Sequence, residues 1–102
     1  VNEVKKDVEA EKKKIMDEAA KKAQQAKDEA KKLSEETKKN GYAQADALQN
    51  KGGNPLEKAA NKKLAEKLRK ETDEKSAKIV SEGDAKADAI MKEAQKQADA
   101  IK

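Results

Sequence analysis

The sequence predicts an all-α protein, an antiparallel hairpin of two long helices with an alanine-rich seam between them. Three observations carry this prediction. Charged residues make up 45% of the 102 residues and aromatic residues 1%, which is typical of long helices rather than of a globule with a large core. The larger apolar residues recur every eleven positions, and the only proline lies beside the glycine pair near the midpoint.

The central stretch ALQNKGGNPLEKAA indicates the end of one helix and the start of another. Gly52 is expected to adopt the left-handed conformation that ends many helices. Asn54 is expected to cap the second helix, with Pro55 at its first position and Glu57 at the spacing of a capping box. The predicted turn residues are Gly52, Gly53, Asn54 and Pro55.

These signals predict one elongated domain with a helix over 3–51, a turn at 52–54 and a helix over 55–101. Each helix would be roughly 70 Å long, at 1.5 Å per residue. An alternative is that the first helix breaks at Asn40-Gly41, which follow two lysines in the manner of a helix C-terminus.

The segments IVSEGDAKADA and IMKEAQKQADA place isoleucine at positions 79, 90 and 101. Eleven residues complete three turns at about 3.67 residues per turn, so the stripe stays on one face and either runs almost straight or coils gently right-handed. The predicted seam residues are Val4, Val8, Ile15, Ala19, Ala23, Ala26, Leu33, Gly41, Leu48, Leu56, Leu64, Leu68, Ile79, Gly83, Ile90, Ala94 and Ile101.

A symmetric fold about the glycine pair aligns the two apolar stripes. This register pairs Thr37 with Leu68 and Gly41 with Leu64, and it often places a large residue opposite a small one. Small partners let helices approach closely, near 8 Å between axes.

The eleven-residue pattern in IMDEAAKKAQQ, IVSEGDAKADA and IMKEAQKQADA resembles the repeats of late-embryogenesis-abundant stress proteins. It also resembles the right-handed stalk helices of rotary ATPases. Either resemblance implies elongated helices without catalytic activity.

The composition argues against an enzyme, because the chain has no His or Cys for acid–base or nucleophilic work. No cofactor and no metal site are expected. Nucleic-acid binding is not expected, since only Arg69 offers a guanidinium and only Tyr42 can stack on a base. The net charge of +4 is spread over interleaved charges of both signs, and the alanine-rich face predicts at most weak membrane contact.

A shoulder beside the main stripe suggests self-association. An alanine seam alone is marginal, because small cores rarely supply more than about 3–5 kcal/mol. The shoulder is expected to pack against a second hairpin as a dimer or four-helix bundle, or else to widen the seam within one hairpin. Its residues are Met16, Ala20, Val80 and Met91.

The sequence therefore predicts a non-enzymatic structural or protein-interaction module that acts as a rigid helical spacer or scaffold, with an unidentified protein partner. One alternative is a holdase-like or lipid-facing amphipathic hairpin, and another is a stress-protection protein of the eleven-residue-repeat type. The compartment is unknown; the start at Val1 rather than Met favours an exported, periplasmic or envelope protein over a cytoplasmic one.

Overall fold

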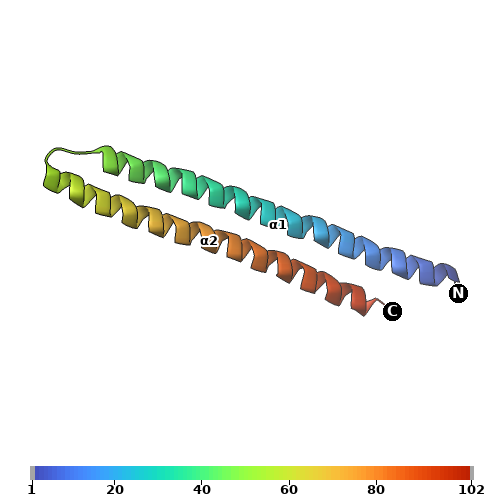
Figure 1. The fold of residues 1–102 in the computed structure, drawn as a ribbon. Coiled ribbons are helices and arrows are strands. Elements are labelled where there is room, and N and C mark those ends of the chain that lie inside the picture. Colours follow the sequence, from blue (N-terminus) through green and yellow to red (C-terminus); the bar gives the residue numbers. More distant parts are fainter. Residues whose placement is uncertain (1, 102) are drawn as a thin grey trace. The chain divides into compact units, whose positions relative to one another are not determined.

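The computed structural model describes residues 2–101, with side chains from residue 4 onward. In this range it contains two helices, α1 (Asn2–Asn50) and α2 (Pro55–Ala100), which pack against each other as the arms of a hairpin (Figure 1). The predicted all-α hairpin is confirmed. Each helix end lies within one residue of its predicted position.

Helix α1 continues without interruption through Asn40 and Gly41, so the alternative break at this point is wrong. The residues that follow, Tyr42 to Asn50, belong to the same helix. Alanine and glutamine dominate that segment, and their helix propensity outweighs the single glycine, which costs about 1 kcal/mol relative to alanine.

The chain leaves α1 in a different way from the one predicted. The backbone N–H of Lys51 donates to the Leu48 carbonyl at 3.2 Å, and the Asn61 side-chain amide donates to the Lys51 carbonyl at 2.7 Å. No glycine among the described residues has a positive φ, so the left-handed conformation expected of Gly52 is wrong. The Leu48 carbonyl, which a left-handed Gly52 would have helped to satisfy, is satisfied by Lys51, and a side chain from α2 satisfies the next free carbonyl, that of Lys51.

Asn54 caps the second helix. Its side-chain Oδ1 accepts the backbone N–H of Glu57 at 2.8 Å, and its carbonyl accepts the first helical hydrogen bond, from Lys58, at 3.1 Å. Pro55 is the first helical residue, where its missing N–H costs nothing.

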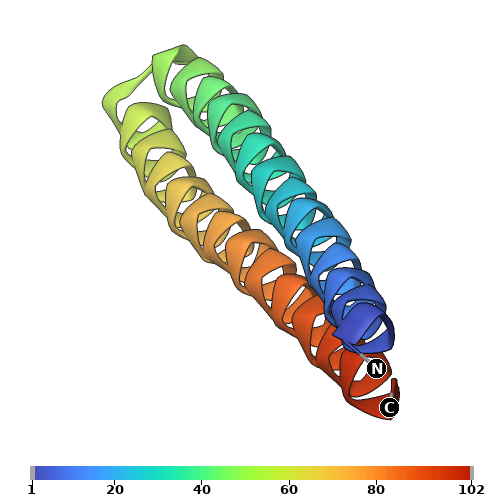
Figure 2. The same cartoon turned by 90° about the vertical axis from the view of Figure 1, so that its right-hand side faces the viewer.

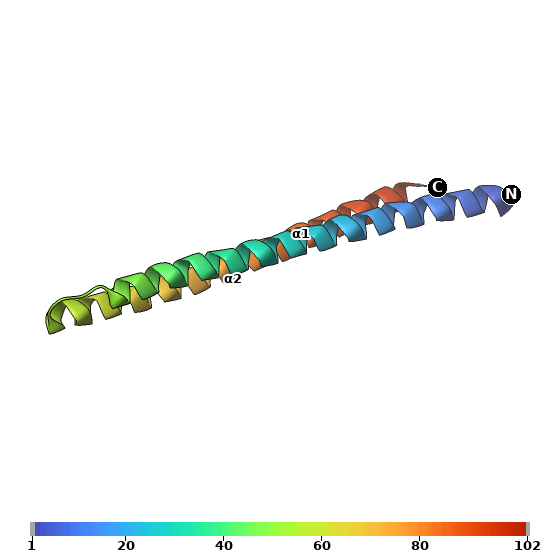
Figure 3. The same ribbon diagram turned by 90° about the horizontal axis from the view of Figure 1, so that it is seen from above.

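The hairpin divides into two compact units, and each contains a segment of both helices. Unit 1 comprises Val1–Glu29 and Glu82–Lys102, and unit 2 comprises Ala30–Ser81, including the connection between the helices. In each unit the two helix segments run side by side in opposite directions (Figures 2 and 3).

The interior of both units is built from small side chains. Every buried hydrophobic residue among those described is alanine, and the buried polar residues are two serines and one threonine. Large seam residues such as Ile15, Leu68 and Ile90 are only half-buried. The buried residues of unit 1 are Ala19, Ala23, Ala26, Gly83, Ala87, Ala94 and Ala98, and those of unit 2 are Ser34, Ala45, Ala65, Thr72 and Ser76.

The register in unit 2 differs from the symmetric one. Gly41 lies against Thr72 instead of Leu64, a displacement of eight residues along α2, or about 12 Å. The connection does not fold back tightly, and the first turns of α2 extend beyond the last residue of α1 (Figure 1). All residues from Gln49 to Ala60 are exposed as a result.

Four predicted seam residues are exposed. Val4 is 66% exposed, Leu33 52%, Leu56 80% and Leu64 53%. In unit 1, Val4 belongs to the first turn of α1, and in unit 2, Leu56 belongs to the first turn of α2. Leu33 and Leu64 each immediately precede a buried residue, and one residue turns a side chain by about 100° around the helix.

Candidate interaction surfaces

Two serines join the helices in the interior of unit 2. The Ser34 and Ser76 hydroxyls hydrogen-bond to each other, and the Ser76 Oγ lies 3.2 Å from the Ser34 carbonyl oxygen. Each hydroxyl has one proton, so the consistent arrangement has Ser76 donating to the carbonyl and Ser34 donating to the Ser76 Oγ. The two hydroxyls are therefore satisfied within the interior, where they join the two helices.

Two further contacts cross the seam at its surface. The Tyr42 hydroxyl donates to the Asp73 carboxylate, at 2.8 Å from Oδ1 and 3.0 Å from Oδ2. The Asp46 carboxylate accepts a hydrogen bond from the Arg69 guanidinium at 2.6 Å. Asp46 follows Tyr42 by four residues on α1, and Arg69 precedes Asp73 by four residues on α2. A step of four residues forward on α1 therefore corresponds to four residues backward on α2, as expected for antiparallel helices, so both contacts support the same register.

The hydroxyl of Tyr42 has a perturbed acidity. The hydrogen bond to Asp73 raises the pKa of Tyr42 above its ordinary value of 10.0, with smaller increases from desolvation and from the negative charge of Asp73. The positive charge of Arg69 acts in the opposite direction and lowers this pKa. The neutral phenol, which can donate the hydrogen bond, is therefore the favoured form.

Gly41 marks a close approach of the helices in unit 2. A Cβ added at this position would lie 2.8 Å from the Thr72 Cβ and nearer still to its Oγ1 and Cγ2. Real Cβ atoms do not approach so closely, so Gly41 is required here by packing and not by backbone conformation.

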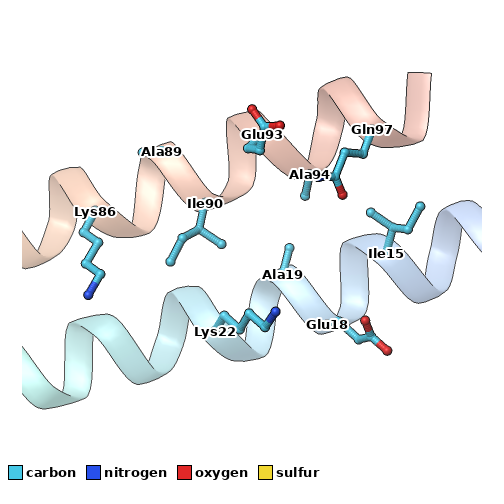
Figure 4. A pocket seen from close by; sticks show the side chains of 10 residues that line it. All are labelled: Ile15, Glu18, Ala19, Lys22, Lys86, Ala89, Ile90, Glu93, Ala94 and Gln97. Carbon is cyan, nitrogen blue, oxygen red and sulfur yellow. The ribbon is translucent and has the colours of Figure 1, made fainter. Parts of the chain in front are cut away.

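Unit 1 carries an open groove of about 440 Å³ along one edge of its seam. Figure 4 shows Ile15 and Ala19 of α1 facing Ile90 and Ala94 of α2. The two isoleucines are half-buried, whereas the two alanines are buried. The groove thus leaves apolar surface in contact with solvent.

Charged side chains form the rims of this groove. Glu18 and Lys22 lie along α1, and Lys86 and Glu93 lie along α2, and all four are exposed (Figure 4). We call the apolar residues and these four charges together the unit 1 groove. Such a surface offers hydrophobic contact flanked by charges of both signs.

The predicted oligomer contacts do not form one surface within a unit. Met16 and Met91 are half-buried in unit 1, and Ala20 is exposed in the same unit. Val80 belongs to unit 2 and is 38% exposed.

The remaining predicted seam residues lie where the two helices meet. Ala19, Ala23, Ala26, Gly83 and Ala94 are buried. The half-buried residues of the predicted set are Val8, Ile15, Gly41, Leu48, Leu68, Ile79, Ile90 and Ile101.

The contacts of Tyr42 and Arg69 escaped the sequence reasoning. In the sequence the two residues stand out as the only tyrosine and the only arginine, and neither fact names a partner. Their spacing from Asp46 and Asp73 carries the signal, since Tyr42 with Asp46 and Arg69 with Asp73 share one face of each helix. The pairing follows only once the register is known.

Residues 2–101 contain no group of three or more His, Cys, Asp or Glu side chains placed to hold a metal ion. Over the same residues, neither helix has a stretch that is long and apolar enough to cross a membrane.

No protein-family model, no curated protein and no solved structure gives a significant match to this chain.

Proposed function

We propose that this chain is a non-enzymatic structural or protein-interaction module, a helical spacer that holds partners apart and associates with itself and with an unidentified protein. The small-residue interior carries this proposal. Two helices of 49 and 46 residues pack in each unit through alanine, serine and threonine, and side chains this small enclose no large site between them.

The exposed surface supports a role that involves partners. The chain exposes 8101 Å², whereas a compact folded protein of its mass, 11.2 kDa, exposes about 5,700 Å². A specific interface of standard size buries about 800 Å² per partner. The excess leaves room for more than one such interface.

We assign the helix packing to the eleven-residue class of coiled coil. In α2 the residues that are at least half-buried include Leu68, Thr72 and Ser76, then Ile79, Gly83 and Ala87, so the steps are four, four and three. This is the spacing of an eleven-residue repeat, and it supports the gently right-handed geometry expected from the isoleucines.

Distances between two spin labels in the full chain, measured by double electron–electron resonance, test the spacer function. Spin labels at Lys6 and Gln49, both exposed on α1, are separated by 43 residues and should give a narrow distribution near 65 Å. Unlabelled chain is added in excess, so that only distances within one molecule are measured. A control pair at Glu35 and Gln49 should give about 21 Å.

A broad or bimodal distribution for the long pair, with a narrow one for the control pair, would contradict the spacer function. It would show that α1 bends or frays outside the segment from Glu35 to Gln49, while that segment of unit 2 remains ordered.

A holdase-like or lipid-facing role is the second candidate, and the apolar floor of the unit 1 groove favours it. In this role Ile15 and Ile90 would contact an unfolded client or a lipid surface. An aggregation assay with an unrelated client protein distinguishes the two. No protection at a stoichiometric ratio excludes the holdase, while protection that is lost in an Ile15→Ser/Ile90→Ser variant supports it.

A further inference from the structure

We propose that the unit 1 groove is the surface on which a second copy of this chain docks, groove to groove and antiparallel to the first. This inference rests on the proposed function, because it names the surface through which the module associates with itself.

The driving force comes from the floor of the groove. Ile15 points across the seam toward α2 beside Ala94, and Ile90 points toward α1 beside Ala19 (Figure 4). Each isoleucine remains half-buried. Apolar surface left in water favours association, in proportion to the area that a partner removes from solvent.

The order of the rim charges determines the orientation of the partner. On α1 the sequence runs from Glu18 to Lys22, and on the antiparallel α2 the same direction in space runs from Glu93 to Lys86. On each helix the carboxylate therefore lies nearer to one end of the groove than the lysine of the same helix, while Lys22 and Glu93 lie at about the same level (Figure 4).

This distribution complements itself under a two-fold rotation. Turning a second copy by 180° about an axis that lies in the interface, at right angles to the groove, brings each helix over its own copy in the opposite direction. Glu18 and Glu93 of one copy then lie toward the lysine ends of the other, and the reverse holds by symmetry. A parallel copy would instead place like charges together. The charges therefore select a second copy of the chain, in antiparallel orientation.

The other candidate face of unit 1 contains Met16 and Met91. Met16 is three residues before Ala19, whereas Lys22 is three residues after it, so the two side chains lie on opposite sides of the seam. The methionine face is therefore separate from the groove, and substitutions can address the two faces independently.

Charge reversal in the full chain tests the proposal by analytical ultracentrifugation from micromolar to submillimolar concentration. Glu18→Lys/Glu93→Lys and Lys22→Glu/Lys86→Glu each replace attraction by repulsion at the rims and should raise the dimer Kd at least about tenfold. A 1:1 mixture of the two variants should form heterodimers with near wild-type affinity. Raising the salt concentration should weaken the wild-type dimer, because exposed charges are screened.

Asp17→Lys/Asp28→Lys is the matched control, with the same net charge as the first variant. Both aspartates are exposed, and each lies two residues from a buried alanine, about 200° around the helix from the seam. This control should dimerise like the wild type. Circular dichroism confirms that each variant remains helical.

Three outcomes overturn the proposal. The first is a wild-type chain that stays monomeric throughout this range. The second is a wild-type dimer that both charge reversals leave intact. The third is a dimer that Met16→Gln/Met91→Gln abolishes while the charge reversals do not, which would assign the contact to the methionine face. None of these results depends on the spin-label distances, so failure of the groove and failure of the spacer function are distinguishable.

Discussion

At Gly41 the helices of unit 2 approach so closely that a single methyl group cannot be accommodated without movement. We expect Gly41→Ala to destabilise the protein, although alanine favours helix by about 1 kcal/mol over glycine. Overpacking of this kind costs about 1–3 kcal/mol, so the net loss should be about 0–2 kcal/mol. Urea denaturation followed by circular dichroism measures it.

The control for Gly41→Ala is a double-mutant cycle with Thr72→Ala. The substitution at position 72 removes Oγ1 and Cγ2, the atoms nearest to the added methyl group. Gly41→Ala should therefore be better tolerated in the Thr72→Ala background, with a coupling free energy of about 0.5 kcal/mol or more. Additive effects would show that the contact with Thr72 is not the cause.

Tyr42 is the only aromatic residue in the chain, so its ionisation can be followed by ultraviolet absorbance without interference. The hydrogen bond to Asp73 raises its pKa, so the midpoint should lie above 10.0 and should fall in Asp73→Asn. Because the pKa is raised in the folded state, the stabilisation is present below about pH 10 and is lost as the pH rises through the folded-state value.

Asp28→Asn is the control for this titration. Asp28 accepts a hydrogen bond from Gln24 and belongs to unit 1, so its substitution should leave the Tyr42 midpoint unchanged. A wild-type midpoint at or below 10.0 would contradict the Tyr42–Asp73 contact in solution.

At the scale of the helices, the register is open to a direct test, because the chain contains no cysteine. Ser34→Cys/Ser76→Cys should form a disulfide under mild oxidation, since the native side chains touch across the seam. Thr37→Cys/Leu68→Cys should not. Thr37 precedes Gly41 by four residues and Leu68 precedes Thr72 by four. Because the helices are antiparallel, these steps lead in opposite directions from the Gly41–Thr72 contact, so the two residues lie about 12 Å apart along the helix axis.

Non-reducing electrophoresis of dilute samples separates the cross-linked form within one chain from a disulfide between chains. Efficient intramolecular cross-linking at positions 37 and 68 would support the symmetric register and contradict the one described here.

The pair of helices followed from the sequence, whereas their register did not. The isoleucine spacing and the Asn54-Pro55 signal are local, and each depends on residues within a few turns of helix. Register depends on differences in packing between alternatives, and an alanine seam packs almost equally well after a slide of one or two turns. Polar contacts such as Tyr42–Asp73 distinguish these alternatives, but their partners are 31 residues apart in sequence.

The unit 1 groove could be predicted from the sequence only in part, for the same reason. Ile15 and Ile90 were expected in the seam because both lie on the eleven-residue stripe. That they would line an open groove depends on how closely Ala19 and Ala94 draw the helices together, and this is a property of the packed pair.

For the molecule as a whole, the alanine interior predicts an unusual thermodynamic signature. Unfolding a domain of about 100 residues typically has a ΔCp of about 1.2–1.5 kcal/mol/K, mainly because apolar surface becomes exposed. This chain buries alanine and leaves its larger apolar residues half-exposed, so ΔCp per chain should be below about 1 kcal/mol/K. Differential scanning calorimetry at several pH values measures it, and a result near 1.4 kcal/mol/K would indicate a larger buried interior.

The connection at one end of unit 2 has a practical consequence for grafting. Residues 51–60 are all exposed, and the start of α2 is held by its own Asn54 cap and by the Asn61–Lys51 contact rather than by a tight bend. Lengthening a flexible loop costs only about 0.6 kcal/mol for each doubling of its length. The peptide bond between Gly52 and Gly53 is therefore a suitable insertion site, where a guest peptide or a second domain can be inserted without changing the sequence of either helix.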